Sequence, residues 1–138
     1  MANKLVIANG KKKDIIEGGR AYLNSLDMRL FVADITPTGT TQPAYPGDEC
    51  ADGGYSPVAN PYPNAFATLG TVGAATGVNI TWIFTHSGGD FTAYGIFFTD
   101  PADGGVTVMS QRDDAPFTVT AAGQVYVATA YFELDTEP

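Results

Sequence analysis

The residues that could do chemistry in this chain are a single histidine, a single cysteine and several neighbouring carboxylates. Nucleophilic catalysis needs a base beside a serine, threonine or cysteine, and histidine is the usual base. His86 stands where a turn joins two predicted strands, so we interpret it as a polar ring at a strand end. The chain has no Gly-x-Ser-x-Gly elbow, and no glycine pair lies between a strand and a helix as a phosphate loop does. We therefore predict no catalytic residues, no cofactor and no enzymatic activity.

Two adjacent carboxylate pairs, Asp48-Glu49 and Asp113-Asp114, are the candidates for acid–base work. Glycoside hydrolysis needs two acids that face each other across a cleft. Neighbouring residues on a strand face opposite ways, and both pairs lie close to proline and glycine. We interpret both pairs as solvated loops, and a sugar-cleaving enzyme ranks third among the functional hypotheses.

Acidic turns raise the question of calcium, which binds hard oxygen ligands. Asp48, Glu49 and Asp52 precede a glycine pair, and Asp100 and Asp103 flank a second turn. Neither segment follows the ligand pattern of an EF-hand, and aspartate and glycine are also what turns use for local hydrogen bonds. We therefore interpret these residues as turns and predict no metal site.

Cysteine and charge limit the class of protein. Cys50 is the only cysteine, so no disulfide can form within the chain. The formal net charge is −8, which disfavours nucleic-acid binding. No stretch is apolar over the length of a membrane span, and the apolar run near the start is too short for a signal peptide. We predict a protein made inside a cell, with neither nucleic acid nor membrane as partner.

Basic residues gather at the beginning of the chain. Residues 1–29 carry six basic and three acidic groups, a net +3, whereas residues 30–138 carry a net −11. Such a basic leader on an acidic body can bind an acidic neighbour, including another copy of the chain. Within it, the predicted partner-binding residues are Lys4, Lys11, Lys12 and Lys13.

Residues 40–65 are rich in proline, glycine, asparagine and aspartate, and they also carry tyrosines. Proline lacks the N–H group that a central strand needs, so this segment is predicted to be a long loop. Long loops inside compact domains often make functional contacts. Tyrosine among proline and glycine is typical of contact surfaces. We add Tyr45, Tyr55 and Tyr62 to the partner-binding residues, where they suit protein binding and sugar stacking equally well.

Short apolar runs separated by turns predict an all-β fold, a β-sandwich of jelly-roll type with one short N-terminal helix over residues 14–26. We expect an N-terminal arm over residues 1–13 and a single β-sandwich domain over 14–138. The sequence pattern predicts β-strands over residues 28–34, 77–85, 91–99, 106–111, 117–120 and 124–134. Residues 94–98 are apolar on both faces, so that strand must be buried on both sides or covered by a partner.

Several of these segments resemble a group of small proteins from the virion region of tailed bacteriophages. The run from Met28 to Thr38 is similar to a stretch near the front of those chains, and Gly54-Tyr55 matches a later pair. The segment Tyr94-Gly95-Ile96-Phe97-Phe98-Thr99-Asp100 matches their aromatic strand well. Residues 106–111, Pro116 and 124–134 then follow in the family's order, so the resemblance covers residues 14–134, although loop 40–65 is longer than the family's.

The resemblance implies a virion structural protein, either a capsid decoration (cement) protein or a tail-associated accessory protein, and it carries no active-site residues. We expect a capsid decoration protein, assembled in the host cytoplasm, that binds the major capsid protein or another virion protein. Decoration proteins commonly form symmetric oligomers, so we expect a homotrimer. The alternative is a carbohydrate- or receptor-binding tail module that stacks sugars on its loop tyrosines.

Overall fold

The structure, a computed structural model, describes residues 5–59, 61 and 76–132. It contains two antiparallel sheets, which we call sheet A and sheet B. Sheet A has the strand order β1-β6-β5-β2-β3, and sheet B pairs β4 with β7. The strands are β1 (Leu5–Ile7), β2 (Asp27–Phe31), β3 (Val58–Ala59), β4 (Thr76–Ile83), β5 (Phe91–Asp100), β6 (Val106–Val119) and β7 (Val125–Phe132).

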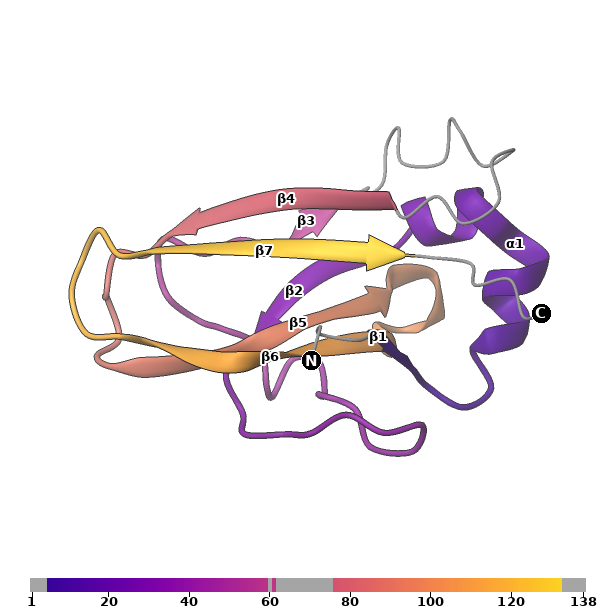
Figure 1. The fold of residues 1–138 in the computed structure, drawn as a ribbon, viewed down its shortest axis with the longest axis horizontal. Coiled ribbons are helices and arrows are strands. Elements are labelled where there is room, and N and C mark those ends of the chain that lie inside the picture. The colour runs from indigo at the N-terminus through magenta and orange to yellow at the C-terminus, as the bar shows by residue number, and fades with distance from the viewer. Residues whose placement is uncertain (1–4, 60, 62–75, 133–138) are drawn as a thin grey trace.

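The two sheets face each other across the hydrophobic core, as Figure 1 shows with β4 and β7 lying over β2, β5 and β6. Core residues come from both layers, with Met28, Ile96 and Phe98 from sheet A and Trp82 and Tyr126 from sheet B. The all-β prediction is confirmed. The jelly-roll arrangement is not, because the described strands form sheets of five and two strands.

The N-terminal segment is built into sheet A. Strand β1 pairs with β6 from Leu5↔Gln111 to Ile7↔Met109, and Leu5 and Ile7 pack against the core. The described part of the predicted arm over residues 1–13 is therefore an edge strand and a turn, and the predicted boundary falls inside a helix. A run of three apolar residues is too short to indicate a strand by itself, but here three ladder pairs to a long neighbour are sufficient.

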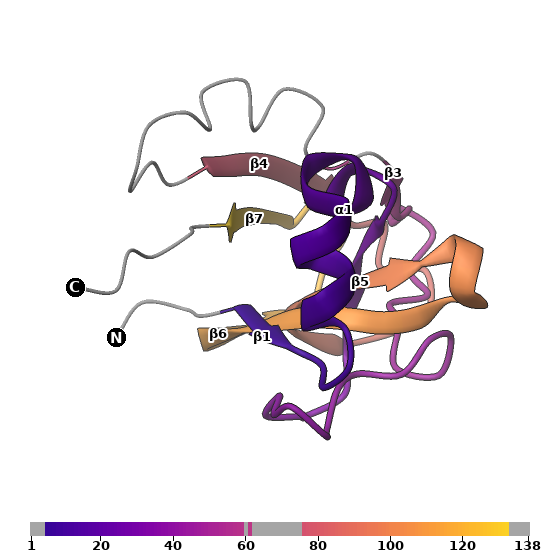
Figure 2. The ribbon, with the colours of Figure 1, turned by 90° about the vertical axis from the view of Figure 1, so that its right-hand side faces the viewer.

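The single α-helix of the described residues, α1 (Lys12–Asn24), lies across one end of the two sheets (Figure 2). It starts two residues before the predicted helix, and no side chain caps its first turn. Gly19 has a φ of +52°, which kinks the helix at the glycine pair that the sequence places in its middle. The Tyr22 hydroxyl donates to Asp100 at 3.1 Å and ties the second half of the helix to the end of β5. A 3-10 turn, η1 (Pro101–Asp103), follows β5 there.

Strand β6 is longer than the sequence indicates. The pattern predicts two strands, over 106–111 and 117–120, whereas β6 continues from Val106 to Val119. Its register with β5 shifts between Ala93 and Gly95, which absorbs the irregularity while the ladder resumes on both sides. Pro116 is tolerated because it lies between Arg112 and Phe117, where the ladder to β5 is interrupted. No described strand pairs with the opposite side of β6 at that point.

The β5–β6 ladder predicts a strong effect of a methyl group at residue 95. A Cβ on Gly95 would overlap the backbone oxygen of Gln111, and neither strand can move without disturbing the ladder. We expect Gly95→Ala to lower the free energy of unfolding by about 2–3 kcal/mol in urea denaturation. A Cβ on Gly47 meets nothing, so Gly47→Ala should change it by less than about 0.5 kcal/mol. Equal stability of the two variants would contradict this packing.

Candidate functional site

Arg29 is the centre of the polar network on the outer face of sheet A, the face turned away from sheet B. Its side chain is 10% exposed, and Nε donates to the Thr99 hydroxyl at 2.8 Å. One terminal nitrogen donates to both carboxylate oxygens of Glu49, at 2.8 and 2.9 Å, and the other contacts Asp27 at 3.3 Å. The Tyr45 ring lies 3.9 Å from the guanidinium carbon, so the cation is enclosed by two carboxylates, a hydroxyl and an aromatic face.

Around this centre, residues 32–50 form what we call the outer strap, which runs along the outer face of sheet A below β5 and β6 in Figure 1. Thr107 donates to the carbonyl oxygen of Pro43 at 2.5 Å, and Ser110 bonds Gln42. Beneath the strap, Phe31 and Phe97 are fully buried and meet edge to face at 6.2 Å. The second apolar side of β5 is therefore covered by the chain itself, which settles one alternative left open by the sequence.

The two described loop tyrosines, Tyr45 and Tyr55, lie in different surroundings. The Tyr55 hydroxyl donates to Glu49 at 2.8 Å, and its ring packs 5.7 Å from Trp82 beside the core. Burial raises the pKa of Tyr55, and its carboxylate neighbour acts in the same direction. The ring and hydroxyl of Tyr55 therefore make contacts within the fold, and its role in partner binding stays a prediction. Tyr45 is 42% exposed, although it packs against Arg29, and Tyr62 lies outside the described residues.

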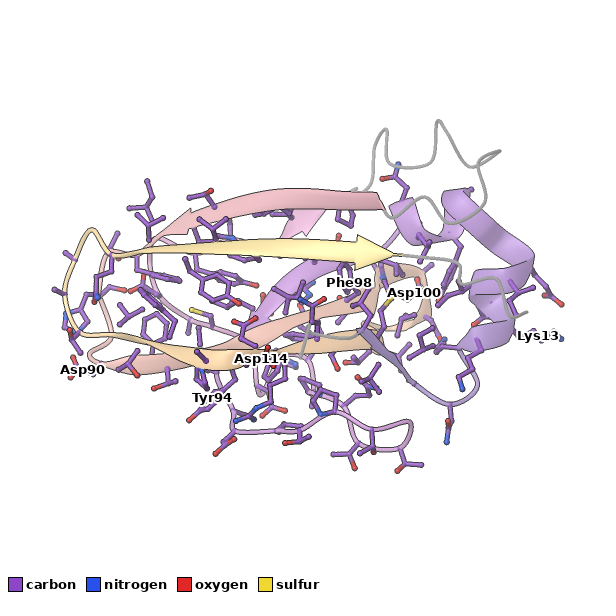
Figure 3. All side chains as sticks on the ribbon, in the orientation of Figure 1. Lys13, Asp90, Tyr94, Phe98, Asp100 and Asp114 are labelled. Carbon is purple, nitrogen blue, oxygen red and sulfur yellow. The ribbon has the colours of Figure 1, made fainter. Side chains whose placement is uncertain are left out.

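The predicted partner-binding lysines that the structure describes differ in their exposure to solvent and in their ion pairs. Lys11 has a 15% exposed side chain and pairs with Asp103 at 2.8 Å and with Asp14 at 3.4 Å. The hydrogen bond to Asp103 is the main reason that its pKa is raised. Lys12 is exposed, and Lys13, labelled in Figure 3, has a 77% exposed side chain that only approaches Glu17 at 3.8 Å. Lys4 lies outside the described residues, so Lys12 and Lys13 are the described lysines that can meet a partner.

The acidic turns are held by internal hydrogen bonds. Asp52 is 7% exposed and accepts from the backbone N–H groups of Gly54, Thr85 and Ser87 at 2.8, 2.8 and 3.0 Å. Desolvation opposes its charge, but these donors outweigh it and lower the pKa of Asp52 to about 2. The carboxylate joins the segment after the outer strap to the β4–β5 turn.

Two other acids of the predicted turns, Asp48 and Asp100, also accept hydrogen bonds from nearby backbone N–H groups. Asp48 accepts from the Ala44 N–H at 2.7 Å, and Asp100 accepts from the Ala102 N–H at 3.0 Å. Over residues 5–59, 61 and 76–132, no three histidine, cysteine or acidic side chains are grouped so that they could hold a metal ion.

The pair Asp113-Asp114 lies within strand β6 and not in a loop, which corrects the prediction. The Tyr126 hydroxyl of β7 donates to Asp113 and links the two sheets. Burial raises the pKa of Asp113, with the neighbouring Asp114 acting in the same direction against the hydrogen bond from Tyr126. Alternation along the strand places Asp114, which is exposed, on the other face. The two carboxylates therefore do not face a common substrate position.

His86 is bonded to Asp90 at 2.7 Å and has a φ of +58°, as expected for a residue in the turn between β4 and β5. Asp90 also borders a cavity of about 180 Å³. Its lining comes from Val32, from residues 49–52 and from residues 88–91. Cys50 lies at this cavity but is 5% exposed, and burial raises the pKa of its thiol.

Sheet B has an exposed apolar face that was not predicted from the sequence. Ile83, Val125 and Val127 are 59%, 44% and 59% exposed on the side of β4 and β7 turned away from the core. The neighbouring residues on the same strands, Trp82 and Tyr126, point to the opposite side and into the core. The period-two pattern of residues 124–134 contains the signal, since it places Val125 and Val127 opposite the buried positions.

No protein-family model, no curated protein and no solved structure matches the chain. The assignment to an all-β class therefore depends on the strand pairing described above. None of the described helices is long and apolar enough to span a membrane.

The Arg29 network predicts a large and non-additive loss of stability. Arg29→Met leaves the Glu49 carboxylate without its main partner, so we expect the free energy of unfolding to fall by about 3–5 kcal/mol. In a double-mutant cycle, Glu49→Gln should cost less in the Arg29→Met background than alone. Arg112→Met is the matched control, because its partner Asp34 has a 70% exposed side chain, and it should cost about 1 kcal/mol. Additive effects of the Arg29 and Glu49 changes would contradict the network.

Asp52 predicts a specific pH dependence. Its pKa is lowered on folding, so the stability it contributes is present above the unfolded pKa of 3.8 and is lost as the pH falls through about 2. We expect Asp52→Asn to be less stable than the parent by about 2 kcal/mol at pH 7, and this difference should shrink between pH 4 and pH 2. Glu17→Gln, an exposed carboxylate, serves as control. A difference that stays constant over that pH range would exclude this role of Asp52.

Proposed function

We propose that the chain is a structural accessory protein of a tailed-bacteriophage virion, specifically a capsid decoration protein that binds and stabilises the assembled shell. The observation that carries this proposal is the pair of exposed lysines, Lys12 and Lys13, at the N-terminal end of α1 on a chain of net charge −8. The partner surface is then an acidic patch of the major capsid protein or of another virion protein, met in the host cytoplasm during assembly.

Electrostatics within the chain gives these lysines a cost that binding would explain. The N-terminal end of a helix carries a partial positive charge, which disfavours nearby cations. Lys11 is compensated by Asp103 and Asp14, whereas the one ion pair of Lys12 and Lys13 among the described residues is the contact of Lys13 with Glu17 at 3.8 Å. An acidic partner removes this repulsion, and complementary charge also speeds the encounter of two proteins.

Shell stabilisation requires buried contact area and no chemistry. A protein that binds only the assembled state favours that state by mass action. The best match of the phage resemblance, residues 94–100, is the central strand β5 of sheet A, so it supports a shared fold element and not a shared site. This agrees with a family whose members act by binding.

A sugar-binding tail module is the alternative. Its stacking platform would need several exposed rings, but among the described loop tyrosines only Tyr45 is exposed, with Tyr55 packed beside the core. Binding of the purified chain on a glycan array, abolished by Tyr45→Ala, would favour this module over the decoration protein.

The proposal predicts that the chain is a component of phage particles. Immunogold electron microscopy with antibodies to the chain should label the heads of particles from cells that encode it. Recombinant chain should co-sediment with shells stripped of it, and Lys12→Gln/Lys13→Gln should weaken this binding at low salt more than at high salt.

The control for that change is Thr40→Glu/Thr41→Glu, which alters the net charge by the same −2 at an exposed part of the outer strap. It should bind shells more tightly than the lysine variant. Unlabelled particles together with no co-sedimentation would refute the decoration role, and label confined to tails would move the chain to the tail.

A further inference from the structure

The two sheets differ in how their edges are protected. Sheet A ends in strands of three and two residues, β1 and β3. Where β6 runs beyond its pairing with β1, it carries Asp114 and Pro116. Short edge strands, charges and proline are devices that prevent pairing with another chain. The edges of sheet A are therefore protected against pairing with another chain.

Sheet B has none of these devices in its described strands. Residues 76–83 and 125–132 contain no charged residue and no proline, and their eight ladder pairs run without a bulge. On the outer face, Ile83, Val125 and Val127 are exposed together with Thr81. A two-stranded ribbon is marginal by itself and gains from further strands. Sheet B thus has the properties of a sheet that is continued by another chain.

Neither outer edge of sheet B is paired with a described strand, but the edge beyond β4 is approached by another segment at its Ile83 end. Beside β4 lies the segment that follows the outer strap, because the Trp82 indole donates to the Ser56 carbonyl oxygen at 2.8 Å. Next to it, a Cβ on Gly54 would overlap the Ile83 carbonyl oxygen, so the two backbones are in close approach. Strand β7 pairs with β4 on one side, and no described strand pairs with its other side.

Charge and symmetry favour a second copy as the occupant of this edge. Two copies of net charge −8 repel each other, and the contact that brings least like charge together is one without charges. The sequence offers this at β7, since residues 115–132 contain no charged residue. An antiparallel pair of identical strands is self-complementary about a two-fold axis, so one open edge is sufficient.

We propose that β7 of one molecule pairs antiparallel with β7 of a second copy about a two-fold axis near the middle of the strand. This joins two two-stranded sheets into one four-stranded sheet and places Val127 of both copies at the contact. The inference names the self-association surface of the proposed shell-binding protein, and it gives a dimer in place of the trimer expected from the sequence. It rests on strand edges and not on the lysines, so it stands or fails separately from shell binding.

Light scattering of the purified full chain over a range of concentrations tests the pairing. We expect a dimer, and Val127→Lys should raise its dissociation constant by about 10-fold, because a lysine on each copy places two like charges on the same face of the joined sheet, close to the two-fold contact. Ile16→Lys is the matched control, since Ile16 is 81% exposed on α1 and should leave the dimer unchanged. Circular dichroism of both variants shows whether they are folded.

A second measurement does not depend on the lysine variant. A spin label on Val127→Cys should give a distance below about 20 Å between copies, because paired strands lie about 4.8 Å apart. A label on Ile16→Cys should give a longer distance. A monomer at every concentration, a trimer, or a dimer that Val127→Lys leaves intact would overturn the proposal. A dimer that responds as expected but is not found in phage particles would leave the pairing valid and refute only the decoration role.

Discussion

The buried Arg29 guanidinium is the interaction on which the outer half of the molecule depends. Arginine in the interior is tolerated only when its charge is paired and its N–H groups are bonded. Glu49, Thr99, Asp27 and the Tyr45 ring meet that requirement, and they come from three parts of the chain. The demand for these partners holds the outer strap against sheet A, and the strap in turn covers the phenylalanines on that face.

This constraint determines which surfaces remain for function. Segments that look like contact loops in the sequence are used to close the fold, as Glu49 shows by accepting from both Arg29 and Tyr55. Asp52 extends the same closure to the β4–β5 turn. The described surfaces that stay exposed include the uncharged outer face of sheet B and the lysine end of α1. A binding role fits such a molecule, with one apolar and one basic surface.

The sequence could predict the strands but not what covers them. Period-two alternation identified β4, β5 and β7 closely because their core faces are strongly apolar. Proline content predicted a loop over residues 40–65, which missed the short edge strand β3 at Val58–Ala59. It could not show that Tyr55 folds inward, because its position depends on Glu49 and Trp82, which are near it only in space. It also divided β6 near Asp113 and Pro116, where the ladder to β5 is interrupted after Arg112 and resumes at Phe117 although the strand itself continues.

The candidate site, like the fold, could be predicted from the sequence only where it depends on residues that are close together in the chain. Lysines near a helix start can be located from the chain alone, but the pairing of Lys11 with Asp103 joins residues 92 apart. The charge-free stretch over residues 115–132 is visible in the sequence, whereas its meaning depends on knowing that β7 has an unpaired edge. The position of a strand can be read from neighbouring residues, whereas the exposure of its edge depends on how the whole chain folds.

The central claim is that sheet A is closed by its own chain while sheet B is left open for another. Hydrogen exchange of the full chain, measured by mass spectrometry at low and high protein concentration, tests it most directly. The account predicts that amides of β7 exchange more slowly at high concentration, while those of the outer strap and β5 are unchanged. Concentration-dependent protection of the strap, or none in β7, would contradict it.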